Sequence, residues 1–296
     1  MKSGFVSIIG KTNAGKSTLL NQIVKSKVSI VTHKQQTTRN AIQGIYNDDD
    51  SQIVFIDTPG ILNPHQKLDK FMNKQAYGSL DGIDAVILLV DAGNPYNEEK
   101  DLPLLKSLVN LECPFFIVFN KIDLTNIFLI NNLKKKYQEV FPNAEIIEIS
   151  AAKNVNVELL INKIKDILPE GYQFYPEEVK SDHPISFLIG EIIREKMLLC
   201  LDQEVPHCTA VKIEKMEKIN DTLQIMATIV CERDSHKGII IGKQGAMLKK
   251  IGSAARYEIE RMMEMQINLK LWVKVRKEWR DSDIQLKNFG YNSKEL

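Results

Sequence analysis

The stretch GKTNAGKS, Gly10 to Ser17, decides the fold, because it lies between an apolar run and a helical pattern. Phe5–Ile9 predicts a buried strand, and Lys16–Val24 predicts a helix. The spacing fits G-x-x-x-x-G-K-[ST], a loop whose backbone N–H groups bind phosphate at the N-terminus of a helix. A chance Gly-Lys-Ser turn is the alternative, but it would need neither the strand nor the helix. The sequence therefore predicts a phosphate-binding loop.

Each residue type in this loop has a physical role. Gly10 and Gly15 allow the backbone to wrap closely around phosphates. Lys16 places a positive charge beside the β- and γ-phosphates, and the Ser17 hydroxyl is a ligand for Mg²⁺. The nucleotide-binding residues predicted in this segment are Gly10, Asn13, Ala14, Gly15, Lys16, Ser17 and Thr18.

The first half of the chain alternates predicted strands with predicted helices. A length of 296 residues suits two domains, and a hydrophobic content of 44% allows substantial cores. Strand–helix alternation predicts an α/β domain with a mostly parallel sheet, which binds ligands at the carboxyl ends of its strands. The predicted strands are Phe5–Ile9, Ile53–Ile56, Ala85–Val90, Phe115–Phe119 and Glu145–Ile149, and the helices include Lys16–Val24, Asp101–Leu108, Ile130–Val140 and Val157–Ile167.

The pattern breaks in LPEGYQFYPEEVKSDHP, residues 168–184, whose prolines, glycine and charges predict a linker or an ordered crossing segment. The order of elements beyond it predicts a smaller α+β domain. The predicted limits are a first domain over 1–168, a linker over 169–184 and a second domain over 185–296. The elements expected in the second domain are helix Ile185–Leu201, strands Thr209–Lys218 and Thr222–Cys231, a glycine-containing loop, helix Ala246–Met265 and strand Leu269–Val275.

Composition restricts the partners and the compartment only weakly. The net charge is +1, and residues 183–296 carry 19 Lys and Arg against 16 Asp and Glu, so the second half is the better candidate for nucleic acid. Four scattered cysteines argue against a metal site or a disulfide framework and favour a reducing compartment. Without an 18-residue apolar run or a signal peptide, we expect a cytoplasmic protein.

A second glycine motif, DTPG, follows the predicted strand Ile53–Ile56. The Asp57 carboxylate would hold Mg²⁺ through its water shell, and Gly60 leaves the backbone N–H open to a γ-phosphate. The next residue, Ile61, offers no side-chain hydrogen bond to an attacking water. Alone, D-x-x-G is a common turn. Downstream of a phosphate loop, it predicts the second part of the same site.

Two further strand ends carry residues suited to a guanine base. Asp123 of the NKID motif can accept two hydrogen bonds from guanine that adenine cannot donate, while Lys121 covers the base and Asn120 braces the phosphate loop. An N-capped turn is the alternative for this tetrapeptide. The stretch SAAK follows the last predicted strand, and the backbone N–H groups of Ser150, Ala151 and Ala152 are placed to read guanine O6.

Taken in order, GKTNAGKS, DTPG, NKID and SAAK resemble the GTPase superfamily, which implies a P-loop GTPase domain that binds GTP and GDP with Mg²⁺. The segment QTTR, Gln36 to Arg39, resembles that of the Era family of ribosome-assembly GTPases. By that resemblance Thr38 would reach Mg²⁺ in the GTP state, with Thr37 as the near alternative. A polar surface loop is the plain alternative. The family often has proline and valine at Thr12 and Ala14, which are sterically mild departures.

The second half contains a glycine-rich stretch, GIIIGKQGAMLKKI, that opens a helix. It resembles the G-x-x-G loop of KH domains, where a bare backbone lets a nucleic-acid strand approach closely. A plain glycine turn is the alternative, and the order of elements favours a KH domain whose extra elements lie N-terminal. The RNA-binding residues that this resemblance implies are Gly242, Lys243, Gln244 and Gly245.

EIIREKMLLCLDQEVPH (191–207), LKLWVKVRKEWRDS (269–282) and the tail 286–291 also resemble the Era family. That family implies binding to the 3′ end of small-subunit ribosomal RNA within the 30S subunit. It also implies peripheral membrane attachment at the inner membrane face, for which this sequence shows no lipidation signal. We expect a monomer, since nothing suggests an obligate oligomer. Trp272 alternates within a predicted strand and is expected in the core.

The leading functional hypothesis is a GTP-hydrolysing ribosome-assembly factor in which GTP orders the switch loops and changes how the KH domain docks on RNA. Lys16 and Thr38 are the predicted catalytic residues. Because Ile61 cannot place the water, we expect slow intrinsic hydrolysis, with Asn13 as a candidate K⁺ ligand against the alternative of a turn-favouring asparagine. The other classes are a nucleotide-gated RNA-binding module without significant catalysis and a metabolic P-loop kinase, which NKID argues against.

Overall fold

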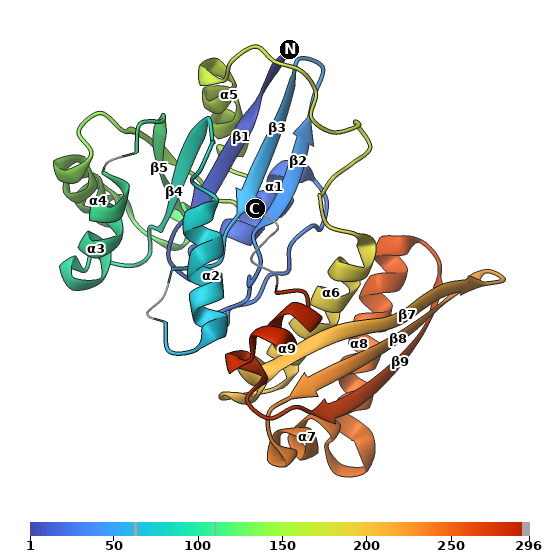
Figure 1. Cartoon of the computed structure of the whole chain (residues 1–296). Helices are drawn as coiled ribbons and strands as arrows, with labels where there is room; N and C mark the ends of the chain where they lie inside the picture. Colours follow the sequence, from blue (N-terminus) through green and yellow to red (C-terminus); the bar gives the residue numbers. More distant parts are fainter. Residues whose placement is uncertain (62–63, 110, 292–296) are drawn as a thin grey trace. The chain divides into compact units, whose positions relative to one another are not determined.

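The computed structural model describes residues 1–61, 64–109 and 111–291, which divide into two compact units (Figure 1). The first unit comprises Met1–Val28, Asn40–Leu62 and Gln75–Asp182, and the second comprises Ser29–Arg39, Asn63–Lys74 and His183–Leu296. Two short segments that the sequence placed in the first domain are thus grouped with the C-terminal residues. The domain limits at 168 and 185 stay a prediction.

The first unit is built on a six-stranded sheet in the order β2-β3-β1-β4-β5-β6. All neighbouring pairs are parallel except β2 with β3, so the predicted mostly parallel sheet is confirmed. The strands are β1 (Lys2–Ile9), β2 (Ile42–Asn47), β3 (Ser51–Asp57), β4 (Ala85–Asp91), β5 (Phe115–Asn120) and β6 (Glu145–Glu148).

The antiparallel strand β2 was not predicted from the sequence. Gly44 interrupts its apolar pattern, and glycine within a strand weakens the signal for one. The structure gives the reason for this glycine. A Cβ at Gly44 would lie 2.5 Å from Leu20 Cδ1 and 2.9 Å from Val24 Cγ2, so its absence lets helix α1 (Lys16–Val24) pack directly on the strand.

Helices cover both faces of this sheet (Figure 1). On one face α1 packs beside α5 (Val157–Ile167), and both present buried aliphatic side chains to the sheet. On the other face α3 (Glu98–Leu108) and α4 (Ile127–Val140) share a core with strands β1, β4 and β5. That core contains Ile9, Val86, Leu88, Leu105, Leu108, Ile117, Phe119, Ile130, Leu133 and Tyr137.

Residues 169–182 form an ordered crossing segment, one of the two readings that their composition allowed. Glu170 forms a β-bridge with Lys2, and Ser181 forms one with Gly44. The rings of Phe174 and Phe5 lie 4.7 Å apart. Through these contacts the segment belongs to the first unit.

The second unit contains a three-stranded sheet of β7 (Thr209–Ile219), β8 (Thr222–Cys231) and β9 (Gln266–Val275), in that order. Strand β8 pairs antiparallel with β7 and parallel with β9. Helices α6 (Ile185–Cys200) and α8 (Ala246–Met263) lie together on one face of the sheet and enclose an aliphatic core (Figure 1). The buried residues of this core include Ile189, Ile193, Met197, Ile225, Ile229, Ile251, Ala255 and Ile259.

The loop expected between β8 and α8 contains a helix, α7 (Asp234–Ile241), so that part of the prediction was wrong. Its sequence, DSHKGIII, contains one glycine followed by three β-branched isoleucines. These residues have low intrinsic helix propensity, so local sequence alone disfavours a helix here. Tertiary packing overrides that propensity, because His236 and Ile240 are buried. The remaining helices are α2 (Lys67–Gly78) and α9 (Asp283–Asn288), and no helix of the described ranges is long and apolar enough to cross a membrane.

The two tryptophans differ in their burial. Trp279 is fully buried, and its Nε1 donates to the Cys208 carbonyl at 3.0 Å. Trp272 was expected in the core, and this was wrong, because its side chain is 45% exposed. Strand alternation explains the difference. Leu271 and Val273 pack against the core, so Trp272 lies on the opposite face.

Candidate functional site

The phosphate loop joins β1 to α1 at the carboxyl end of the sheet, where the sequence predicted it. Its two glycines are required by the conformation and by space. Gly15 has φ +101°, and a Cβ there would lie 2.3 Å from Asn120 Nδ2. Gly10 has φ +154°, and a Cβ there would lie 2.4 Å from the Leu89 carbonyl oxygen. Any other residue at these positions would force the loop apart.

Lys16 is buried beneath this loop. Its Nζ donates to the carbonyls of Gly10 and Lys11, both at 3.0 Å. Burial lowers the pKa of Lys16 to about 8, and the charge of Asp57 offsets only part of that effect. A phosphate beside this ammonium group would favour its charged form. Binding of a phosphate group at this loop would therefore stabilise the charged form of Lys16.

Oxygen atoms suited to Mg²⁺ meet at the start of α1. The Ser17 hydroxyl donates to Asp57 Oδ2 at 2.6 Å, and Asp57 is completely buried at the end of β3. A hydroxyl and a carboxylate are hard ligands of the kind that Mg²⁺ prefers, so the residues fit this ion. Gly60 approaches the phosphate loop so closely that a Cβ would lie 2.9 Å from the Thr12 nitrogen.

The residues predicted to bind the base are tied to the phosphate loop. Asn120 donates to the Ala14 carbonyl at 2.8 Å and accepts from the Ala151 N–H at 3.0 Å. Lys121 Nζ donates to the Asn13 carbonyl at 2.7 Å. Asn120 thus connects its own NKID motif to the phosphate loop and to the SAAK segment, which are three of the four parts of the predicted site.

The Asp123 carboxylate is oriented by its neighbour on the last loop. Ser150 Oγ donates to Asp123 Oδ1 at 2.6 Å, and the Lys153 N–H donates to Ser150 Oγ at 3.2 Å. The carboxylate is thereby fixed in place while its other oxygen remains an acceptor. Ala152, beside them, is exposed.

Two acidic residues at this end of the sheet were missed by the sequence analysis. Asp91 Oδ2 lies 2.7 Å from Lys121 Nζ, and Asp101 Oδ1 lies 2.5 Å from Lys11 Nζ. Asp91 could have been found, because it follows the predicted strand Ala85–Val90 and pairs in register with Asn120. Asp101 gave no such signal, since it lies inside a helix.

The QTTR segment belongs to the second unit, whereas Ser17 and Asp57 belong to the first. Thr38 is buried, and Thr37 Oγ1 donates to the Lys34 carbonyl at 2.7 Å. That Thr38 reaches Mg²⁺ in the GTP state stays a prediction.

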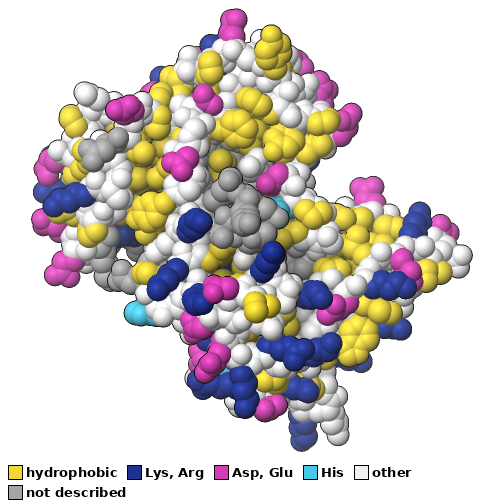
Figure 2. Space-filling view, viewed as in Figure 1, with side chains coloured by type: hydrophobic (Ala, Val, Ile, Leu, Met, Phe, Trp, Pro, Cys, Tyr) yellow, Lys and Arg dark blue, Asp and Glu magenta, His cyan; other side chains and the backbone are white. Residues whose placement is uncertain are grey.

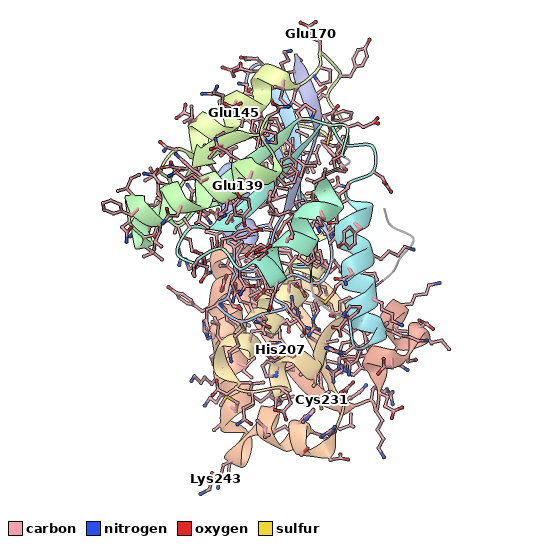
Figure 3. The ribbon with its side chains drawn as sticks, turned by 90° about the vertical axis from the view of Figure 1, so that its left-hand side faces the viewer. Glu139, Glu145, Glu170, His207, Cys231 and Lys243 are labelled. Carbon is pink, nitrogen blue, oxygen red and sulfur yellow. The ribbon has the colours of Figure 1, made fainter. Side chains whose placement is uncertain are left out.

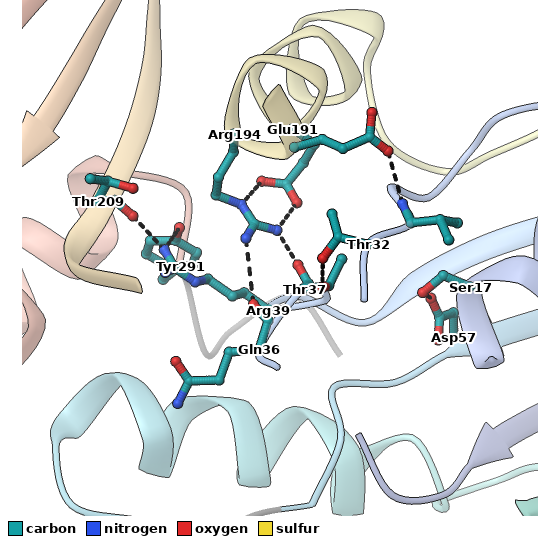
Figure 4. A network of polar contacts seen from close by, with 12 residues as sticks. Ser17, Thr32, Gln36, Thr37, Arg39, Asp57, Glu191, Arg194, Thr209 and Tyr291 are labelled. Atoms are coloured by element: carbon teal, nitrogen blue, oxygen red, sulfur yellow. Dashed lines mark hydrogen bonds and ion pairs between the residues drawn. The ribbon is translucent and has the colours of Figure 1, made fainter. Parts of the chain in front are cut away.

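Two buried arginines hold this segment against the C-terminal residues (Figure 4). Arg39 donates to the carbonyl of Thr209 at 2.6 Å and to the hydroxyl of Tyr291 at 3.0 Å. Arg194, on α6, donates to the Thr37 carbonyl and pairs with Glu191, whose Oε1 lies 2.7 Å from Arg194 Nε. The switch segment is thus an integral part of the packing of the second unit.

The predicted RNA loop lies between α7 and α8 and contains a 3-10 turn, Lys243–Gly245. Gly242 has φ +71°, and a Cβ there would lie 2.7 Å from Met247 Cβ, whereas Gly245, at φ +80°, faces open space. Figure 3 shows the Lys243 side chain pointing outward at the end of the ribbon, and Gln244 is also exposed. An open groove adjoins the loop, lined by Gly245, Leu248, Lys249, Gly252, Ser253, Arg256, Leu269 and Leu271.

Comparison with known proteins identifies a GTPase domain and a KH domain in this chain. A family model described as a 50S ribosome-binding GTPase matches residues 5–121, and a KH domain model matches residues 204–280. The chain is 49% identical to GTPase Era of Clostridium botulinum over 296 residues, which cover 99% of each chain. This chain belongs to the GTPase Era family. GTPase Era of Lacticaseibacillus paracasei is 46% identical, with 99% of this chain and 98% of that protein covered.

Two solved structures of this family resemble the chain over nearly its whole length. A variant of Aquifex aeolicus Era bound to GDP and AlF4⁻ matches with a TM-score of 0.92, and Era in complex with MgGDPNP and nucleotides 1506–1542 of 16S ribosomal RNA matches with 0.94. Each is 37% identical and covers 98% of this chain and 99% of its own. As a member of the family, the chain is a GTPase that binds guanine nucleotides.

Proposed function

We propose that this GTPase binds small-subunit ribosomal RNA through its KH domain, under control of the bound nucleotide, and acts in assembly of the 30S subunit. The observation that carries the proposal is the groove beside Gly245, whose lining includes Lys249 and Arg256. The resemblance to the RNA complex of Era supports 16S ribosomal RNA as the ligand. That likeness extends over 98% of the chain, so it outweighs the description of the model matched by residues 5–121, which mentions the 50S subunit.

The groove has the properties that a single RNA strand requires. Among the residues that line it, Leu248, Leu269 and Leu271 provide apolar contacts for bases, and Lys249 and Arg256 supply positive charge for phosphates. At one end, the exposed Lys243–Gly245 turn has a glycine in open space, where a sugar-phosphate backbone can approach without meeting a side chain.

The hydrolytic site follows from the residues of the phosphate loop. Mg²⁺ bound by Ser17, and by Asp57 through water, would neutralise charge on the β- and γ-phosphates. Lys16 adds a second positive charge beside the β- and γ-phosphates during in-line attack of water. Ile61 cannot orient the water, so we propose slow intrinsic hydrolysis. Asn13, exposed at φ +64° in the phosphate loop, is the proposed K⁺ ligand.

The position of the switch segment supports nucleotide control of RNA binding. Residues 29–39 contact the C-terminal residues directly. Arg194 on α6 donates to the Thr37 carbonyl, and Arg39 donates to the carbonyl of Thr209, the first residue of β7. Recruiting Thr38 to Mg²⁺ in the GTP state would change these contacts. Because α6 and β7 pack into the same hydrophobic core as the KH residues, the two nucleotide states would present different arrangements of the second unit to RNA.

Replacing Gly245 with aspartate tests the RNA site. The structure makes Gly245 a better choice than Gly242, because a side chain at 245 meets open space and one at 242 strikes Met247. We expect Gly245→Asp to weaken binding of 16S nucleotides 1506–1542 at least tenfold, since a carboxylate would face the phosphates. Unchanged affinity would refute RNA binding at the Lys243–Gly245 turn.

Gly82→Asp is the matched control. Gly82 has a similar φ of +68°, also faces open space, and lies in the first unit between α2 and β4. Both variants introduce the same side chain, charge and backbone strain. GTP turnover of Gly245→Asp, measured against a Lys16→Ala variant as background, should equal that of the unmodified protein. A loss of turnover in Gly245→Asp would mean that the substitution damages the fold.

A further inference from the structure

The outer face of strand β9 carries an aromatic side chain between cations. Its residues alternate between the core and solvent, as strand geometry requires. Lys270, Trp272 and Lys274 are all exposed on the outer face, and Arg276 follows directly after the strand. Figure 2 shows Lys and Arg side chains beside hydrophobic ones over this sheet.

The charge on this face is uneven. No Asp or Glu occurs between Gln266 and Val275. Among residues 1–61, 64–109 and 111–291, neither Lys270 nor Lys274 forms an ion pair within 4.0 Å. Two of the three lysines of β7 differ, because Lys212 and Lys215 pair with glutamates two residues along the same strand, whereas Lys218 has no ion pair within 4.0 Å among the described residues.

Those β7 pairs are Lys212–Glu214 at 2.9 Å and Lys215–Glu217 at 2.8 Å. The charge of Lys274 also reaches Glu214, but more weakly than that of Lys212, which bonds it directly. Strand β9 therefore carries two lysines and no acidic residue at the edge of the sheet, whereas two of the three lysines of β7 are neutralised on their own strand.

This face adjoins the groove proposed to bind RNA. Leu269 and Leu271 of β9 line that groove, and the residues next to them, Lys270 and Trp272, point to the other side of the same strand. In the sheet order β7-β8-β9, strand β9 has no neighbour on its outer edge among the described residues. An RNA strand that leaves the groove over this edge passes directly onto the outer face.

We propose that the outer face of β9 is a second RNA-contact surface, on which Trp272 stacks on a base and Lys270 and Lys274 bind the flanking phosphates. It extends the proposed KH site around the strand edge, and it rests on the proposed function. Exposed aromatic rings flanked by cations suit single-stranded nucleic acid, because every base has a π-face and every nucleotide has a phosphate. A single RNA strand matches both features of this face, because it brings a phosphate to each lysine and a base to the indole ring.

Two RNA probes of different length test this surface. The long probe is 16S nucleotides 1506–1542, and the short probe is the tightest binder among six-nucleotide oligonucleotides tiled across it, sized for a groove that holds about four nucleotides. We expect Trp272→Ala to weaken binding of the long probe roughly tenfold and to leave the short probe unaffected. Trp272→Phe should retain most of the affinity, because it keeps an aromatic face.

The lysines are tested through salt dependence. Replacing Lys270 and Lys274 together with alanine should lower the slope of log affinity against log salt by about 1.4 for the long probe, since each phosphate contact contributes about 0.7. The matched control replaces Lys212 and Lys215, which lie on β7 and are already paired with glutamates. We expect that control to change the slope by less than half as much.

The Gly245→Asp and Trp272→Ala variants together distinguish failure of this proposal from failure of the proposed function. If Gly245→Asp weakens both probes while Trp272→Ala weakens neither, the KH groove stands and the second surface is refuted. If Gly245→Asp weakens neither probe, the proposed function itself fails. If Trp272→Ala changes the sedimentation of the protein but not its RNA affinity, the face is a protein interface and the proposal is wrong.

Discussion

Burial of the Lys16 ammonium group should make nucleotide affinity depend on pH. In the free protein this burial lowers the pKa of Lys16 from 10.5 to about 8. Bound phosphates favour the charged form and should return the pKa to at least its ordinary value. Above pH 8 the free protein has lost the proton that the complex requires, so nucleotide binding takes up a proton and affinity falls as pH rises.

The size of the effect follows from the two pKa values. With about 8 in the free protein and 10.5 in the complex, affinity for GDP should be about tenfold weaker at pH 9 than at pH 7. Proton uptake on binding should rise from about 0.1 at pH 7 to about 0.9 at pH 9. Below pH 7 Lys16 is charged in both states and should contribute no pH dependence.

Calorimetric titration of GDP in two buffers with different ionisation enthalpies measures this uptake. The guanine N1–H also ionises at alkaline pH, so the control is a Lys16→Met variant, in which only the guanine contribution remains. The difference between the two proteins at pH 9 isolates Lys16. Equal proton uptake by both proteins would refute the claim that Lys16 is buried with a lowered pKa.

Three further substitutions test separate contacts. Asp123→Asn should shift preference from GTP to xanthosine triphosphate in competition binding, and retained preference for guanine would contradict its role in reading the base. Arg39→Met should lower the free energy of unfolding in urea by roughly 3 kcal/mol, because the carbonyls of Thr209 and His207 lose a buried donor; a loss below about 1 kcal/mol would contradict it. Asn13→Ala should remove any excess of GTP turnover in K⁺ over Na⁺, and an unchanged excess would exclude Asn13 as the K⁺ ligand.

Much of the first unit could be predicted from the sequence, because its signals are local. Buried parallel strands form continuous apolar runs, and the loops after them carry the motifs. Strand β2 was not predicted, because Gly44 interrupts its apolar pattern. The glycine is needed there because Leu20 and Val24 of α1 pack directly against the strand. Helix α7 escaped detection for a similar reason, because burial of Ile240 stabilises a segment whose own propensity is poor.

The site could be predicted where a functional residue lies in a short motif that follows a predicted strand. The link from Asn120 to both Ala14 and Ala151 follows from strand ends that meet at one edge of the sheet. Contacts between distant segments carry no such local signal. Neither the anchoring of Thr37 by Arg194 nor the exposure of Trp272 could be deduced from spacing alone, since each depends on which face of an element meets the core.

The central claim is that nucleotide state controls RNA binding, and one measurement tests it most directly. The affinity of the purified protein for 16S nucleotides 1506–1542 is measured at fixed salt with Mg²⁺ and either GDPNP or GDP. We predict at least tenfold tighter binding with GDPNP, because only the γ-phosphate state recruits the switch segment away from its contacts with Arg194. Equal affinity in the two states would contradict the account.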